Sequence, residues 1–153
     1  NKLSQLARSF DATLFMLLLA GYQVVLSRYA SQDDVCVGIP VAGRNRRELE
    51  GLIGFFINAV VIRTTIDKEP TLEGLINQVR EATLGAYAHQ DIPAEMLLDA
   101  LQIERNLSYG PVAQVGFALQ NLPIDRQAIT LEGLRIEPVD FDHVTAKYDL
   151  TLL

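Results

Sequence analysis

The chain has 153 residues, 49% of them hydrophobic, and a formal net charge of −6 at pH 7. This length and apolar content predict one folded domain with a proper core and exclude a disordered chain. The negative charge, and the lack of aromatic residues interleaved with the basic ones, argue against binding to nucleic acid or to an anionic membrane.

The N-terminal part of the chain predicts two helices. Leucine and alanine recur at helical spacing in the opening stretch, and Asp11 or Thr13 offers an N-cap for a second helix over 14–30. The most apolar part of that helix, 14–26, contains Gln23 and is shorter than the ~20 residues that a bilayer requires. We therefore expect a buried helix of a cytoplasmic protein, with neither a membrane span nor a signal peptide.

Two apolar, β-branched segments predict strands. The first is DVCVGIPVAG, at 34–43, and a charged loop with at most a helical turn follows it. The second, FFINAVVIRTTI at 55–66, is so continuously apolar that we expect it to lie centrally in its sheet. Cys36, the only cysteine, lies in the first strand, where an inert buried thiol in a reducing compartment is expected rather than a nucleophile.

The C-terminal half predicts two more helices and further strands. Thr71 can cap a helix that runs towards residue 89, and its apolar stripe consists of Leu72, Leu75, Ile76, Val79 and Ala82. A short helix is expected over 93–101, a strand with one buried face over 112–121, and an edge strand over 131–141. The last residues, 147–153, begin an alternating strand that stops without a polar tail, so we expect a fragment of a larger domain.

The stretch HQDIPAE, at 89–95, places one of only two histidines beside a carboxylate. His89 is expected in the last turn of one helix, where an imidazole can bond free carbonyls. Asp91 lies just before the next helix, where a carboxylate can accept first-turn N–H groups, and Pro93 is harmless in that turn. We interpret the stretch as a helix junction rather than as a general base with its orienting carboxylate.

No other pattern of residues predicts catalysis or metal binding. The sequence lacks a phosphate-binding glycine loop, a nucleophile elbow and histidines or cysteines at metal-ligand spacing, since His89 and His143 are far apart. Asn58 is the exception, because a buried amide needs partners and costs about 1–3 kcal/mol without them. It is expected either to tie two strands together or to point into a cavity.

Four segments resemble, in order and spacing, motifs of the condensation domains of nonribosomal peptide synthetases. Residues 37–63 resemble the paired motifs VGxPVAGR and IGFFVNT, and residues 86–101 resemble HQDxPFE. Residues 105–121 resemble RDxSxxPLFQVMFxxQN, and residues 145–152 resemble a strand near the end of the second lobe. Together these segments extend over nearly the whole chain.

The resemblance implies an α/β fold with a mixed β-sheet flanked by helices, one lobe of a two-lobed fold like that of chloramphenicol acetyltransferase. Residues 1–153 would be a partial domain, its C-terminal lobe, without the N-terminal lobe and the final segment. Phosphopantetheine arms of upstream and downstream peptidyl carrier proteins would enter a tunnel between the lobes, with no cofactor bound directly. The family's His-His-x-x-x-Asp-Gly motif is absent here, so no catalytic residue is assigned to this chain.

The same resemblance assigns expected places to individual residues. Asn58 is expected near the substrate tunnel at the lobe interface. Arg44 is expected either to line the groove or, as we favour, to brace its loop through an ion pair. Four further motif residues are expected to be structural: His89, Gln90, Asp91 and Pro93.

Some residues depart from the family's motifs. Ala94 stands where HQDxPFE has phenylalanine, Ala59 where threonine is common, and Asn106 where aspartate is common. These departures indicate a divergent subfamily that still forms amides. The alternatives are an ester-forming or other acyltransferase relative, a non-catalytic lobe that docks carrier proteins, and an independent α/β binding protein, against which the ordered motifs argue.

Overall fold

The computed structural model describes residues 2–102, 112–120 and 145–153, and all statements below concern these residues. The strand predicted over 131–141, together with Asn106 and His143, lies outside them. The described elements follow one another as α1 (Lys2–Ser9), α2 (Leu14–Ala30), β1 (Asp34–Val41), α3 (Arg47–Glu50), β2 (Asn58–Thr65), α4 (Leu72–Ala88), α5 (Ala94–Leu101), β3 (Val115–Phe117) and β4 (Leu150–Leu152).

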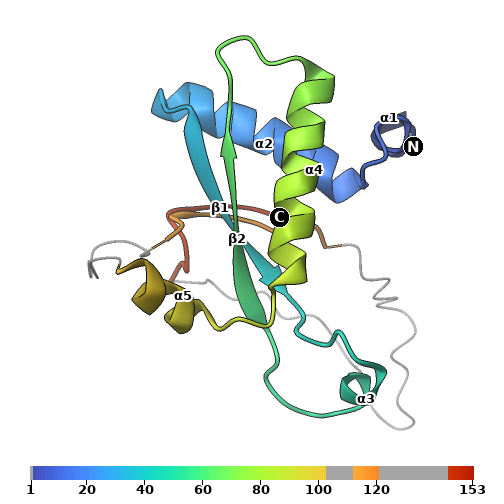
Figure 1. Cartoon of the computed structure of the whole chain (residues 1–153), viewed down its shortest axis with the longest axis vertical. Helices are drawn as coiled ribbons and strands as arrows, with labels where there is room; N and C mark the ends of the chain where they lie inside the picture. Colours follow the sequence, from blue (N-terminus) through green and yellow to red (C-terminus); the bar gives the residue numbers. More distant parts are fainter. Residues whose placement is uncertain (1, 103–111, 121–144) are drawn as a thin grey trace, which may run out of the picture.

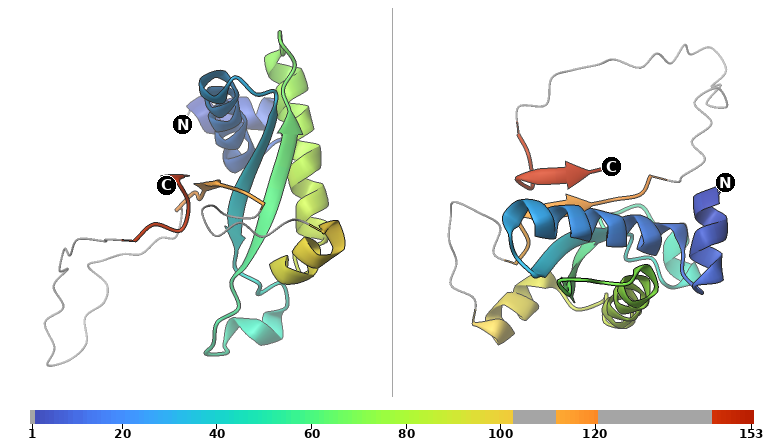
Figure 2. Two further views of the ribbon diagram at one scale, coloured as in Figure 1. Left: turned by 90° about the vertical axis from the view of Figure 1, so that its left-hand side faces the viewer. Right: turned by 90° about the horizontal axis from the view of Figure 1, so that it is seen from above.

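The four described strands form one mixed sheet in the order β2-β1-β3-β4. β1 and β2 pair antiparallel, from Asp34 opposite Thr65 to Val41 opposite Asn58. β3 runs parallel to β1, and β4 runs parallel to β3 on its outer side (Figure 2). The predicted α/β fold with a mixed sheet and packed helices is therefore confirmed.

The prediction that the second apolar segment lies centrally is wrong, because β2 is an edge strand of the described sheet. Its burial alternates as in a strand with one covered face: Val60, Ile62 and Thr64 are buried, and their neighbours are less so. The apolar run is continuous for another reason. Ile57 and Ala59, which flank the start of β2, line a cavity described below.

Both long helices begin at the threonines that the sequence indicates. The Thr13 hydroxyl accepts a hydrogen bond from the Met16 N–H at 3.2 Å, and the Thr71 hydroxyl accepts one from the Gly74 N–H at 3.1 Å. Such caps satisfy N–H groups that have no partner within the helix. Ser31 is the C-cap residue of α2 and adopts a left-handed conformation with φ 51°. The predicted helix over 14–30 is confirmed to the residue.

The core lies between the sheet and these two helices, where α4 runs along β2 and α2 crosses both long strands (Figure 1). The predicted stripe on α4 is confirmed at Leu75, Ile76 and Val79, whereas Leu72 in the first turn is 51% exposed. Burying a side chain of this size stabilises the fold by about 1.5–3 kcal/mol. The largest fully buried side chains are Leu19, Ile62, Ile66, Ile76, Gln23, Val37, Val79, Thr64 and Thr83.

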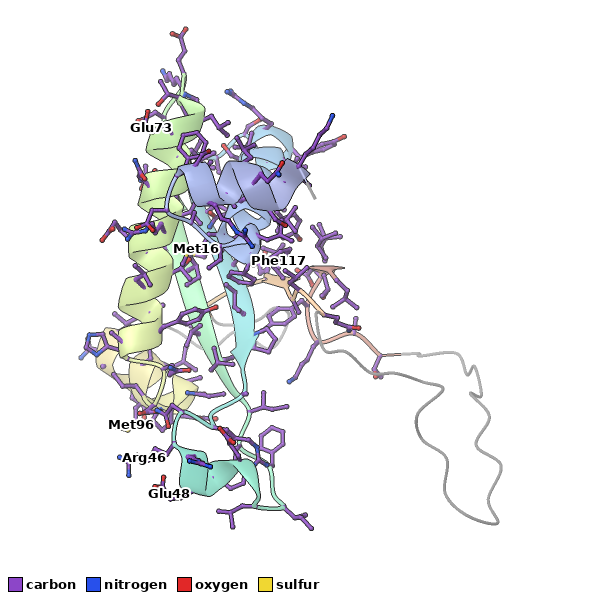
Figure 3. All side chains as sticks on the ribbon, turned by 90° about the vertical axis from the view of Figure 1, so that its right-hand side faces the viewer. Met16, Arg46, Glu48, Glu73, Met96 and Phe117 are labelled. Atoms are coloured by element: carbon purple, nitrogen blue, oxygen red, sulfur yellow. The ribbon has the colours of Figure 1, made fainter. Side chains whose placement is uncertain are left out.

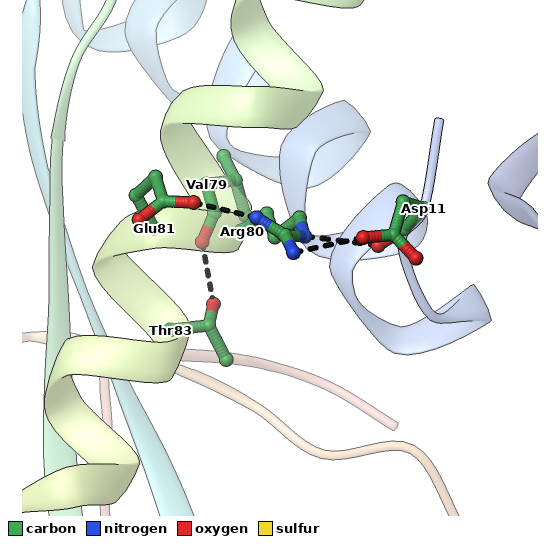
Figure 4. Close-up of polar contacts among 5 residues, drawn as sticks. All are labelled: Asp11, Val79, Arg80, Glu81 and Thr83. Carbon is green, nitrogen blue, oxygen red and sulfur yellow. Dashed lines mark hydrogen bonds and ion pairs between the residues drawn. The ribbon is translucent and has the colours of Figure 1, made fainter. Parts of the chain in front are cut away.

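Arg80 ties α4 to the turn between α1 and α2 (Figure 4). Its guanidinium donates to the backbone carbonyl and to the carboxylate of Asp11, both at 2.9 Å, and to the Glu81 carboxylate at 2.6 Å. Asp11 therefore binds an arginine and leaves the cap of α2 to Thr13. Because the Asp11 carboxylate is exposed, this pair orients the turn and contributes at most about 1 kcal/mol.

Within the described residues, no single helix combines the length and the apolar composition needed to cross a membrane. α1 and α2 meet those criteria only when counted together, and the chain bends by 92° between them.

Gly85→Ala is expected to raise the free energy of unfolding by about 0.5–1 kcal/mol, because glycine inside a helix is less favourable than alanine. A Cβ at Gly85 meets no atom within 4 Å, so the alanine adds no strain. Gly74→Ala in the same helix is the matched control, since its Cβ would lie 2.9 Å from the Thr71 hydroxyl that caps α4. Urea unfolding of both variants checks this: gains of equal size would contradict the role of the cap.

Candidate functional site

A cavity of about 490 Å³ opens beside the sheet, next to the start of α5. Its walls come from Pro40 of β1, from the stretch 55–59, from the first turn of α5, from 116–118, and from the chain around β4. All four segments that carry the family resemblance therefore meet at this one cavity, although they lie far apart in the sequence. It is the candidate functional site.

Asn58, the first residue of β2, holds the helix junction against the sheet. Its side-chain Nδ2 donates to the backbone carbonyls of Gln90 at 2.7 Å and Ile92 at 2.8 Å, and Asn58 also lines the cavity. The tie runs to the turn between α4 and α5 rather than to a second strand. The expected tie between two strands is therefore wrong: the amide ties the helix junction to β2, while Asn58 also belongs to the cavity lining.

The junction residues have other partners than the sequence suggests. The Asp91 carboxylate accepts from the Asn45 side-chain amide at 2.9 and 3.0 Å, so the prediction that it caps α5 is wrong. The N-cap residue of α5 is Pro93, which makes no side-chain cap bond. Because Asp91 lies two residues before this N-cap, its carboxylate is too far ahead of the helix to cap it. His89 ends α4 through its backbone N–H, and its exposed imidazole bonds no carbonyl among the described residues.

Arg44 braces the loop between β1 and β2, although not through an ion pair. Its guanidinium donates to the backbone carbonyls of Leu49 and Gly54 and lies 4.2 Å from the centre of the Phe56 ring. None of the ion pairs in the described part of the chain includes Arg44. Carbonyls and an aromatic face are sufficient partners for a guanidinium. The loop that carries Phe55 and Ile57 into the cavity wall is thereby fixed.

Tyr148 is a site residue that sequence reasoning missed. Its ring lies over Gly38 of β1 and Gly116 of β3, which face each other across the parallel strands. A Cβ at Gly38 would come within 2.8 Å of the Tyr148 hydroxyl oxygen, and a Cβ at Gly116 within 2.7 Å of the ring, so glycine at both positions leaves room for this side chain. Glycine inside a strand commonly marks such a close approach, and both strand segments of the sequence carry this signal.

Phe117 connects the cavity to the core on the other side of β3. The Phe117 side chain, labelled in Figure 3, is 3% exposed. Its ring centre lies 5.1 Å from that of Phe15 and 5.9 Å from that of Tyr22, both on α2. Offset or tilted contacts of this kind stabilise by about 0.5–1.5 kcal/mol each. The predicted strand over 112–121 is shorter than expected, because pairing extends only over Val115–Phe117.

The cavity wall supplies shape and few reactive groups. Glu95 and Lys147 are the charged residues among the described residues that line it, and no histidine, serine or cysteine belongs to that lining. Cys36 lies elsewhere on β1, where burial and the charge of Asp34 raise the pKa of its thiol, so the unreactive protonated form is favoured. Within the described ranges, no group of three His, Cys, Asp or Glu side chains could hold a metal ion.

Comparison with solved structures defines the class of protein. The fold matches a four-domain nonribosomal peptide synthetase bound to AMP and glycine with a TM-score of 0.73 and 34% identity, over 75% of this chain and 9% of that one. It also matches the X-domain from teicoplanin biosynthesis in its complex with OxyB, with a TM-score of 0.70 and 30% identity, over 75% and 25%. The chain therefore has the chloramphenicol acetyltransferase-like fold of condensation domains.

The family follows from the sequence comparison, since residues 1–153 match the Condensation domain family. The chain is 53% identical to part of a linear gramicidin synthase from Brevibacillus parabrevis over 152 residues, which is 98% of this chain and 2% of that protein. It is 41% identical to tyrocidine synthase 3 of the same organism over 152 residues, 99% of this chain and 4% of that protein. The chain thus spans only a few per cent of the length of these relatives. It belongs to the condensation domain family of nonribosomal peptide synthetases.

Proposed function

We propose that this chain is the C-terminal lobe of a condensation domain and forms one wall of the tunnel in which an amide bond is made. The observation that supports this most is the convergence of all four motif segments on one cavity. The tunnel's other wall would be the N-terminal lobe, and Asn58 and the loop braced by Arg44 would lie near the interface between the lobes.

The proposed reaction joins two acyl groups that are each tethered to a carrier protein through a phosphopantetheine thioester. The acceptor amine attacks the carbonyl carbon of the donor thioester, a C–N bond forms, and the C–S bond breaks. The donor sulfur leaves as a thiol, which takes up the proton lost by the amine. Because no histidine lies in the described cavity wall, we assign the proton transfer to the N-terminal lobe.

The contribution of this lobe would be positioning. Holding two tethered reactants in line can supply about 7–11 kcal/mol of a reaction barrier. The partners would be the upstream and downstream peptidyl carrier proteins in the cytoplasm, and no cofactor would be bound other than their phosphopantetheine arms. The similarity to large peptide synthases supports this assignment of partners.

A second candidate function is that of a non-catalytic docking domain. It is favoured by the similarity to the X-domain, which is solved as a complex with OxyB. In that case the cavity would contact a protein rather than enclose two tethered substrates.

The complete condensation domain, tested with two aminoacyl-loaded carrier proteins, is expected to release one donor carrier for each dipeptidyl thioester formed. The isolated chain is expected to form none, because the proton-handling group belongs to the other lobe. Intact-protein mass spectrometry of the carriers measures both. Amide formation by the isolated chain would contradict the proposed division of roles, and carrier binding without product by the complete domain would favour the docking function. Product only from a hydroxyl-bearing acceptor would indicate an ester-forming relative.

A further inference from the structure

Three alanines from three separate segments form part of the cavity wall. They are Ala59 on β2, Ala94 at the start of α5 and Ala118 just after β3. Each has only a methyl group as its side chain, whereas Phe55 and Ile57 in the same lining have large side chains. A longer side chain at any of the three positions would occupy space that is now open.

The position of Ala94 is fixed more firmly than its place at a helix terminus suggests. It lies two residues after Ile92, whose carbonyl accepts the 2.8 Å hydrogen bond from Asn58. A second amide, that of Asn45, holds the Asp91 carboxylate one residue earlier. The methyl group of Ala94 therefore has a defined place relative to β2 and to the cavity.

The chemistry of the wall fits an aminoacyl group. Apolar side chains dominate the lining, and Glu95 and Lys147 are the charged residues in it. Neither of these two makes an ion pair with any residue that the structure describes. A volume of about 490 Å³ also lies within the usual range of small-molecule sites, about 300–1,000 Å³. An aminoacyl thioester combines an apolar side chain with an amine that a carboxylate such as Glu95 can attract.

We infer that the space next to Ala94 receives the apolar side chain of one of the two carrier-borne aminoacyl groups, and that Ala94 sets the size of side chain that is accepted. This inference rests on the proposed function. It makes Ala94 a specificity-determining residue, because the fit of a single methylene in an apolar pocket changes discrimination by about 10- to 200-fold.

Ala94→Phe in the complete condensation domain is expected to lower the rate of dipeptide formation with phenylalanyl or leucyl carriers at least tenfold. The rate with alanyl carriers is expected to change less than threefold. Each aminoacyl group is tested separately on the donor and on the acceptor carrier, and the inference requires the effect on one of the two sides. Ala94→Val is a smaller second variant, for which an intermediate effect is expected.

Ala100→Phe is the matched control, because Ala100 is exposed on the same helix and does not line the cavity. It is expected to leave the ratio of large to small substrates unchanged. If the wild-type domain condenses these substrates but both Ala94 variants keep its ratio on both sides, the inference is wrong and another part of the protein fills the space. If the wild-type domain forms no dipeptide with any pair, the proposed function itself fails, and the inference fails with it.

Discussion

Gly43→Ala is expected to lower the free energy of unfolding by about 2–4 kcal/mol, a large effect for the addition of one methyl group. Gly43 has a φ of +63°, a conformation that L-residues adopt at a cost of about 1–2 kcal/mol. A Cβ there would also overlap the backbone carbonyl oxygen of Phe56, which no side-chain rotation relieves. The chain on one side of the loop must therefore move.

A displacement of Phe56 in Gly43→Ala would reach the cavity, because Phe55 and Ile57, which flank Phe56, belong to the cavity lining. We therefore expect turnover of the complete domain to fall together with stability. Urea unfolding and single-turnover dipeptide formation measure the two quantities. Gly51→Ala in the same loop is the control, since a Cβ there meets nothing within 4 Å and its φ is −85°. Equal stability of the two variants would show that the Gly43 conformation is not required.

The parts of the fold that depend on local physics could be predicted from the sequence. The caps at Thr13 and Thr71 follow from side chains that reach their own helix, and the structure has both. Helix periodicity likewise identified the buried face of α4 apart from Leu72. These signals act over three or four residues, so neighbouring sequence alone is sufficient to determine them.

The parts that depend on partners far away in the sequence could not be predicted. Asp91 had a plausible local role as a helix cap. In the structure its carboxylate instead accepts hydrogen bonds from the side-chain amide of Asn45, which lies 46 residues earlier in the sequence. The edge position of β2 in the described sheet depends on which strands pair. The apolar run at 55–66 predicted a central strand instead, because some of its apolar residues line a cavity rather than a second core face. The role of Tyr148 depends on Gly38 and Gly116 being paired across two strands, which the sequence does not reveal.

Asn58→Asp is expected to lower the free energy of unfolding by about 1–3 kcal/mol and the turnover of the complete domain by about 100-fold. The introduced carboxylate has nearly the shape of the amide but donates no hydrogen bond. It would face the carbonyl oxygens of Gln90 and Ile92, which now accept from Asn58 at 2.7 and 2.8 Å. Turnover falls more steeply than stability because the turn that positions Ala94 on the cavity wall loses its anchor, and small displacements of positioning groups are costly.

The loss of stability in Asn58→Asp is also expected to depend on pH. Two carbonyl oxygens disfavour the charged form, so the pKa of the introduced carboxyl lies above its unfolded value of about 3.9. A raised pKa in the folded state means that the variant is least impaired below pH ~4 and most impaired above the folded pKa. Urea unfolding of the variant and the wild-type domain between pH 4 and 8 measures the difference. A difference that stays constant over this range would show that the amide does not donate to these carbonyls.

Asn45→Ala is the control for Asn58→Asp. It removes another side-chain amide that bonds the turn between α4 and α5 but leaves the tie between Asn58 and this turn in place. Asn45 also donates to this junction, through the Asp91 carboxylate, but it is exposed and does not line the cavity. Its loss is expected to change the free energy of unfolding by at most about 0.5 kcal/mol and turnover by less than tenfold. The loss of turnover is expected to be smaller in Asn45→Ala than in Asn58→Asp because Asn58 anchors the junction directly to β2, whereas Asn45 connects the junction to a loop. Equal losses of turnover in Asn45→Ala and Asn58→Asp would assign the effect to the junction as a whole and contradict a special role for the direct tie between Asn58 and the α4–α5 turn.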